Sequence, residues 1–66
     1  MEIKINNVSL ELPDGATLQD ALDAKGIAPL GIATAVNGKV VAAVLRPSKK
    51  LSEGDNVVII KAFYGG

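Results

Sequence analysis

The residue with the clearest chemistry in this chain is Gly66, which follows Gly65 after an apolar stretch. Because glycine carries no Cβ, a Gly-Gly end can pass through a channel too narrow for any other residue. Its α-carboxylate is a group that a partner enzyme can activate. We expect residues 63–66, Phe63-Tyr64-Gly65-Gly66, to form a flexible tail that threads into such a partner's active site. The alternative is a frayed end or a trimmed linker, because glycine-rich ends are common.

The other side chains offer little chemistry of their own. The sequence has no His and no Cys, so the commonest general base and the best nucleophile are both missing. Asp20 and Asp23 lie three residues apart, but two carboxylates without further ligands make a poor cation site, and a solvated polar face explains them better. No glycine-rich nucleotide motif occurs. We therefore expect no catalytic residue, no metal site and no bound cofactor, which leaves the carboxylate of Gly66 as the group on which a partner enzyme could act.

Composition narrows the class of protein further. Sixty-six residues make one small domain, so we expect residues 1–66 to fold as a single unit. The formal net charge is zero and the chain has one Phe, one Tyr and no Trp, which argues against a nucleic-acid binder. No run approaches the ~20 apolar residues of a membrane span, and Glu2 and Lys4 interrupt any signal peptide. We expect a cytoplasmic monomer, and the lack of cysteine fits a reducing compartment.

The first half of the chain predicts a hairpin followed by a helix. Polar and apolar residues alternate over 2–5 and 8–12 on either side of Asn6-Asn7, which predicts two strands and a turn. The apolar face of this hairpin would carry Ile3, Ile5, Val8, Leu10 and Leu12. After the turn Pro13-Asp14-Gly15, Thr17 is a good N-cap with Asp20 completing a capping-box-like start. Gly26 suits the C-terminal end of a helix of about two turns.

The second half predicts three more strands. In the connection 27–31, Ile27 or Leu30 is expected to pack on the core. Strands are expected at 32–36 and 39–44 around Asn37-Gly38, the strongest hairpin signal in the chain. A polar loop over 46–50 and the apolar anchor Leu51 then lead to a strand at 56–61.

The predicted order β-β-α-β-β-β indicates an α+β fold with a five-stranded mixed sheet and one main helix on one face. The apolar run from Val57 to Ile60 suits a central strand, placed beside and parallel to the first strand. Because one helix covers only one face, part of this run should lie on the open face. We expect Val58 and Ile60 to form a partner-docking surface there, just before the tail, since an exposed apolar patch is typical of docking sites. The alternative is that loops cover this face or that it is simply apolar.

A compact chain of this order ending in Gly-Gly resembles the ubiquitin-like β-grasp fold and, within it, the ThiS/MoaD family of sulfur carriers. It looks most like the carriers of thiamin (thiazole) synthesis. The resemblance covers essentially the whole chain and is carried by the hairpin Glu2 to Leu12, Gly15-Ala16-Thr17-Leu18, Ala35-Val36-Asn37-Gly38-Lys39-Val40-Val41, Leu51-Ser52-Glu53-Gly54-Asp55-Asn56-Val57 and Gly65-Gly66. The chain departs from the family where many members have Pro-Arg and an aromatic residue after the fourth strand. Here the sequence runs Ala42-Ala43-Val44-Leu45-Arg46-Pro47, so we expect the partner surface to differ there.

The resemblance implies a mechanism and a set of partners. A partner related to ubiquitin-activating enzymes uses MgATP to adenylate the Gly66 carboxylate. A cysteine persulfide of another protein then supplies sulfur in place of AMP and leaves a thiocarboxylate, which thiazole synthase consumes. Three alternatives stay open: a carrier for molybdopterin or another sulfur metabolite, a ubiquitin-like modifier joined to lysines, and an interaction module with no activated terminus. The terminal Gly-Gly argues against the last.

Overall fold

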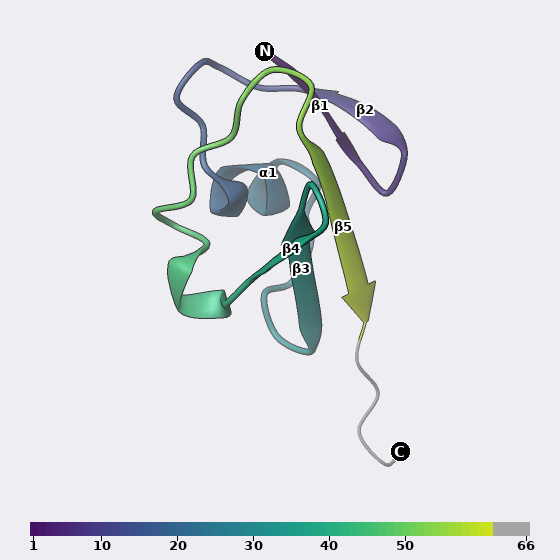
Figure 1. The fold of residues 1–66 in the computed structure, drawn as a ribbon. Helices are drawn as coiled ribbons and strands as arrows, with labels where there is room; N and C mark the ends of the chain where they lie inside the picture. The colour runs from purple at the N-terminus through teal and green to yellow at the C-terminus, as the bar shows by residue number, and fades with distance from the viewer. Residues whose placement is uncertain (62–66) are drawn as a thin grey trace.

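The computed structural model describes residues 1–61, which form a five-stranded mixed sheet and one α-helix (Figure 1). The elements in chain order are β1 (Glu2–Ile5), β2 (Val8–Glu11), α1 (Leu18–Ala24), β3 (Ile32–Val36), β4 (Lys39–Val41), the 3-10 helix η1 (Ala43–Leu45) and β5 (Asn56–Lys61). The strands lie in the order β2-β1-β5-β3-β4. Because β5 is central, parallel to β1 and antiparallel to β3, the predicted arrangement is confirmed.

The first hairpin follows the alternation of its sequence. The register pairs Ile5 with Val8, so alternate residues of β1 and β2 share one face. Asn6 and Asn7 have φ of 48° and 69°, the left-handed conformation that a two-residue type I′ turn requires. Val8 is nevertheless 54% exposed, although it was predicted on the buried face. The reason is that β2 is an edge strand, with a neighbour on one side only.

Helix α1 begins and ends where the sequence predicts. The Thr17 hydroxyl accepts a hydrogen bond from the Asp20 N–H at 3.2 Å, and the Asp20 carboxylate accepts one from the Thr17 N–H at 2.9 Å. At the other end Gly26 has a φ of 67°. Its N–H donates to the carbonyl of Asp23, and the following N–H donates to the carbonyl of Leu22. A capping box and a Schellman motif therefore satisfy the two ends of this short helix.

One hydrophobic core lies between α1 and the sheet. Its buried apolar residues are Ile3, Ile5, Leu12, Ala16, Leu18, Ala21, Leu22, Val36, Leu51 and Val57. The predicted anchor Leu51 enters this core from the connection between η1 and β5, which lies on the same side of the sheet as α1 (Figure 1). Ile27 is half-buried, whereas Leu30 is exposed, so Ile27 is the better packed of the two candidates. Among residues 1–61, no element covers the opposite face of the sheet.

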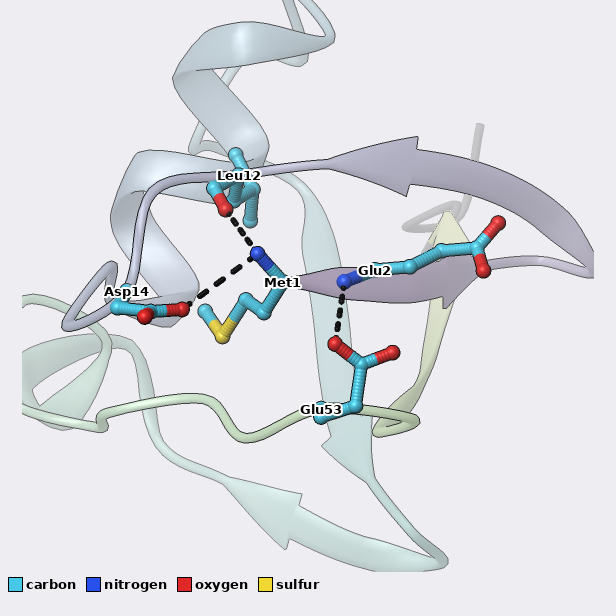
Figure 2. Close-up of polar contacts among 5 residues, drawn as sticks. All are labelled: Met1, Glu2, Leu12, Asp14 and Glu53. Carbon is cyan, nitrogen blue, oxygen red and sulfur yellow. Dashed lines mark hydrogen bonds and ion pairs between the residues drawn. The ribbon is translucent and has the colours of Figure 1, made fainter.

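The start of β1 is tied to both of its neighbours (Figure 2). The amino group of Met1 donates to the carbonyl of Leu12 at 2.6 Å and lies 3.5 Å from the Asp14 carboxylate. On the other side, the N–H of Glu2 donates to the carboxylate of Glu53 at 2.9 Å. The contact between Glu2 and Glu53 holds the turn that precedes β5 against β1, beside which β5 pairs in parallel.

The predicted length of the fourth strand is wrong, because β4 ends at Val41 and η1 follows instead of three more strand residues. In an antiparallel ladder, the next backbone group of β3 to be paired after Thr34 would be that of Ile32. The carbonyl of Ile32 instead accepts a hydrogen bond from Arg46 Nη2 at 3.0 Å. A side chain from the predicted polar loop thus replaces the end of the strand.

Candidate functional site

One half of the open face of the sheet is apolar. Strand β5 provides the largest apolar side chains of this half. Val57 is fully buried against the core, whereas Val58 is 37% and Ile60 61% exposed. Alternate residues of a strand point to opposite faces. The expectation that part of the apolar run from residue 57 to 60 lies on the open face is therefore confirmed.

The strands β3 and β4 extend this surface. The registers pair Ala35 with both Val58 and Val40, and pair Ala33 with Ile60, so all five residues share the open side. We call this set the apolar face. Strand β3 lies in the middle of this face and contributes only small alanine side chains. The larger branched side chains of β4 and β5 flank it on either side. Val40 is 81% exposed, which makes it the most exposed valine of the set.

The rest of the same sheet face is polar. By register, the strands β1 and β2 and the first residue of β5 place Glu2, Lys4, Ser9, Glu11 and Asn56 on the open side. All of these side chains are exposed. The apolar face is therefore confined to the half of the sheet formed by β3, β4 and β5.

Two neighbours hold β5 along its length. On one edge it pairs with the whole of β3, from Val57 to Lys61. On the other edge β1 turns away at Asn6, and the Asn6 side chain takes the place of a further strand residue. Its Oδ1 accepts from the N–H of Ile59 at 2.8 Å, and its Nδ2 donates to the carbonyl of Ile59 at 3.2 Å. The strand that leads toward the C-terminal residues is thus fixed on both sides as far as Ile59.

The described structure bears on only part of the predicted site. Residues 63–66, including the proposed reacting residue Gly66, lie outside the described residues, and their roles stay predictions. Val58 and Ile60 lie together on the apolar face, where their role in docking also stays a prediction. Sequence reasoning missed Ala33, Ala35 and Val40, although the hairpin register set by the Asn37-Gly38 turn was a signal that could have aligned Ala35 with Val40.

Arg46 is a second feature that the sequence did not predict. It is only 3% exposed, and its guanidinium donates to the Thr34 hydroxyl at 3.2 Å and to the carbonyls of Pro29 and Ile32, each at 3.0 Å. The Thr34 hydroxyl in turn donates to the carbonyl of Val41 at 2.9 Å. This network joins the start of β3, the end of β4 and the segment after η1.

Other classes of site find little support in residues 1–61. No three His, Cys, Asp or Glu side chains in that range are grouped so that they could hold a metal ion. None of the helices in the same range is long and apolar enough to cross a membrane.

A family model decides the class of protein. The model of the ThiS family matches residues 1–66, the whole of the chain. The chain belongs to the ThiS family. Membership of this family supports the interpretation of the chain as a small sulfur carrier protein of thiamin biosynthesis. It also implies that the chain interacts with an adenylating activating enzyme and with thiazole synthase. No curated protein sequence matches the chain significantly.

Solved structures show the same fold. The crystal structure of a thiamine biosynthesis protein (ThiS) from Geobacter metallireducens has a TM-score of 0.81 and 20% identity, covering 100% of this chain and 99% of that one. An NMR structure of a thiamine biosynthesis protein from the same organism has a TM-score of 0.76 and 19% identity, covering 100% of this chain and 88% of that one. SAMP1 from Haloferax volcanii has a TM-score of 0.68 and 22% identity, covering 98% of this chain and 97% of that one. The fold is therefore the expected ubiquitin-like β-grasp.

Proposed function

We propose that this chain is a sulfur carrier whose Gly66 carboxylate is adenylated by an activating enzyme and converted to a thiocarboxylate. The thiocarboxylate then donates its sulfur for thiazole formation in thiamin biosynthesis. The observation that carries the proposal is the match of the ThiS family model to the whole chain, with Gly65 and Gly66 included. The absence of His and Cys from the sequence also supports a substrate-like role.

The chemistry requires the terminal carboxylate to become an electrophile. A carboxylate oxygen of Gly66 attacks the α-phosphorus of MgATP and displaces pyrophosphate, which leaves an acyl adenylate. The terminal sulfur of a cysteine persulfide on another protein then attacks the carbonyl carbon and displaces AMP. A thiol attacks the cysteine sulfur of the resulting acyl disulfide, so that a new disulfide forms and Gly66 leaves as the thiocarboxylate. The catalytic groups belong to the partners, and the carrier supplies the terminus and a docking surface.

The apolar face is the surface proposed to dock the activating enzyme. It is exposed, it is confined to one half of the sheet, and it includes β5, the strand that precedes the terminal residues in sequence. Docking there brings β5 to a fixed place on the partner, and five further residues follow β5 in the sequence. Asn6 supports this role by tying β5 to β1 where β1 turns away.

The central experiment measures the chemistry at Gly66. The protein is incubated with MgATP, a ThiS-activating enzyme, a cysteine desulfurase and cysteine, and its intact mass is recorded. We expect a mass gain equal to the replacement of one oxygen by sulfur. An unchanged mass, in a reaction where a known carrier is converted, contradicts the proposal, and covalent conjugates of higher mass indicate a protein modifier instead.

A variant extended by one alanine after Gly66 tests the position of the carboxylate. The extra residue moves the carboxylate by about 3.3–3.6 Å along an extended chain. Reacting atoms must lie within about 3–3.5 Å of each other, so we expect ATP–pyrophosphate exchange to be lost while circular dichroism is unchanged. Exchange at the original rate would refute the role of Gly66.

The docking surface is tested separately by Ile60→Glu. Ile60 is 61% exposed, so we expect the fold to persist and the affinity for the activating enzyme to fall at least about tenfold. Ser9→Glu is the matched control, because it places the same charge on the polar half of the same sheet face. Equal effects of the two changes on affinity would show that the apolar face is not the docking surface.

A further inference from the structure

The charges of this neutral chain are strongly segregated along the sequence. All seven carboxylate residues lie outside residues 24–52, whereas five of the seven basic residues lie inside that range. The five are Lys25, Lys39, Arg46, Lys49 and Lys50. Residues 24–52 contain β3, β4 and η1, so this part of the molecule has an excess of basic side chains although the net charge is zero. The Asp55 carboxylate reaches the β3–β4 turn, where it accepts a hydrogen bond from Asn37 Nδ2 at 2.9 Å.

A groove lies in this part of the molecule, between β4 and the segment that follows η1. We name it the basic edge groove and define it by Lys39, Val40, Val41, Leu45, Ser48 and Lys49. Its volume is about 360 Å³. Val41 and Leu45 provide apolar surface, and Leu45 is 53% exposed. The two lysines are exposed, and within the described part of the chain no carboxylate residue lines the groove.

Both walls of the groove are fixed by hydrogen bonds. On one side, the Thr34 hydroxyl donates to the carbonyl of Val41 at the end of β4, and Arg46 Nε donates to that hydroxyl. On the other side, the carbonyls of Arg46 and Lys49 accept hydrogen bonds from the first N–H groups of α1, at 3.1 and 2.8 Å. A groove that exists before binding loses little conformational entropy when a ligand enters it.

One wall also presents a free strand edge. β4 is the last strand of the sheet, and within β4 the residues Lys39 and Val41 direct their backbone groups toward β3. The N–H and carbonyl of Val40, which lies between them, therefore point away from the sheet. An extended peptide can pair with such an edge through its own backbone.

We propose that the basic edge groove binds an extended acidic segment of a partner protein. The segment's backbone pairs with Val40, an aliphatic side chain packs on Val41 and Leu45, and flanking carboxylates face Lys39 and Lys49. The charge of the groove decides the choice of an acidic segment. Within residues 1–61 the one ion pair joins Met1 and Asp14, so Lys39 and Lys49 have no carboxylate within 4.0 Å in that range. The Asp20 carboxylate, at the nearby start of α1, is held by the Thr17 N–H.

Other occupants fit less well. A second copy of the chain pairing edge to edge would bring Lys39 of both β4 strands close together, and like charges repel each other. A single-stranded nucleic acid would match the charge, but none of the residues 1–61 that line the groove is aromatic and able to stack with bases. The proposal is independent of the chemistry at Gly66, because it uses no residue of the terminus.

The test uses the full-length, ¹⁵N-labelled protein and a synthetic peptide of three valines flanked on each side by three glutamates. We expect amide shift changes centred on the six groove residues, and binding that weakens as salt rises. The double variant K39E/K49E should bind about tenfold more weakly, since it removes two rim attractions and adds repulsion. The matched control K25E/K61E changes the net charge equally at exposed lysines outside the groove and should bind within about twofold of the original protein.

Several outcomes would overturn the proposal. These are shift changes centred on Val58 and Ile60, no binding at millimolar peptide, equal losses in the two double variants, or equal binding of a peptide with serines in place of the valines. Dimerisation through the groove in sedimentation experiments, or stronger binding of an oligothymidylate at the same residues, would assign the groove to another occupant. Ile60→Glu should bind the peptide normally, so a failure here is distinguishable from a failure of the docking proposal.

Discussion

Removing the guanidinium of Arg46 should cost the protein a large part of its stability. This side chain is 3% exposed and donates to Thr34, Pro29 and Ile32. The proposed change is Arg46→Met, which keeps an unbranched apolar chain and deletes every donor. Two partly buried carbonyls and one buried hydroxyl then lose their partner.

The size of the effect follows from opposing terms. A hydrogen bond to a charged group contributes about 1.5–3 kcal/mol, and three such bonds are lost. Burying the guanidinium costs several kcal/mol in the original protein, and the variant is relieved of that cost. We expect a net loss of about 3 kcal/mol, against a total of about 3–10 kcal/mol for a domain of this length. The melting temperature should fall by about 12–24 °C.

Urea unfolding followed by circular dichroism measures this loss, provided that the m-value is unchanged. Lys50→Met is the matched control, since it makes the same type of change at an exposed position and should alter stability by less than about 0.5 kcal/mol. Thr34→Val removes one acceptor and should show coupling to Arg46→Met in a double-mutant cycle. A loss below about 1 kcal/mol in Arg46→Met would refute the buried network.

Three further changes test the local structure. Thr17→Ala removes one side of the capping box and should lower the unfolding free energy by about 1 kcal/mol in urea titrations, and an unchanged midpoint would contradict the cap. Gly26→Ala should cost about 1–2 kcal/mol through its φ of 67° alone, because a Cβ there meets no atom within 4 Å, and a stabilised variant would argue against the Schellman end. Asn6→Asp keeps the acceptor for the Ile59 N–H but loses the donor to its carbonyl. Faster hydrogen exchange should appear around Ile59, and unaltered protection would show that β5 is held without Asn6.

The sequence alone was enough for most of the local structure, because the deciding interactions join residues only a few positions apart. Asn37-Gly38 adopts positive φ at both positions, as a type I′ turn demands. The Thr17 cap and the Gly26 end act within one helical turn of their partners. Polar and apolar residues alternate on both sides of Asn6, and β5 has a continuous apolar run. Few strand arrangements bury the apolar side of both segments, so the strand order could also be inferred.

What the sequence left open depends on contacts between distant parts of the chain. In the sequence, Arg46 has the pattern of a solvated loop residue. Its hydrogen-bond acceptors lie 12–17 positions away, and no local sequence pattern indicates that they would meet it. Its burial ends β4 early and fixes one wall of the basic edge groove. In the same way, which lysines line that groove was decided only when β4 was placed at the edge of the sheet. Hydrophobic periodicity predicts which face of a helix or strand is buried. Which polar groups from distant parts of the chain come into contact is decided only by the tertiary structure.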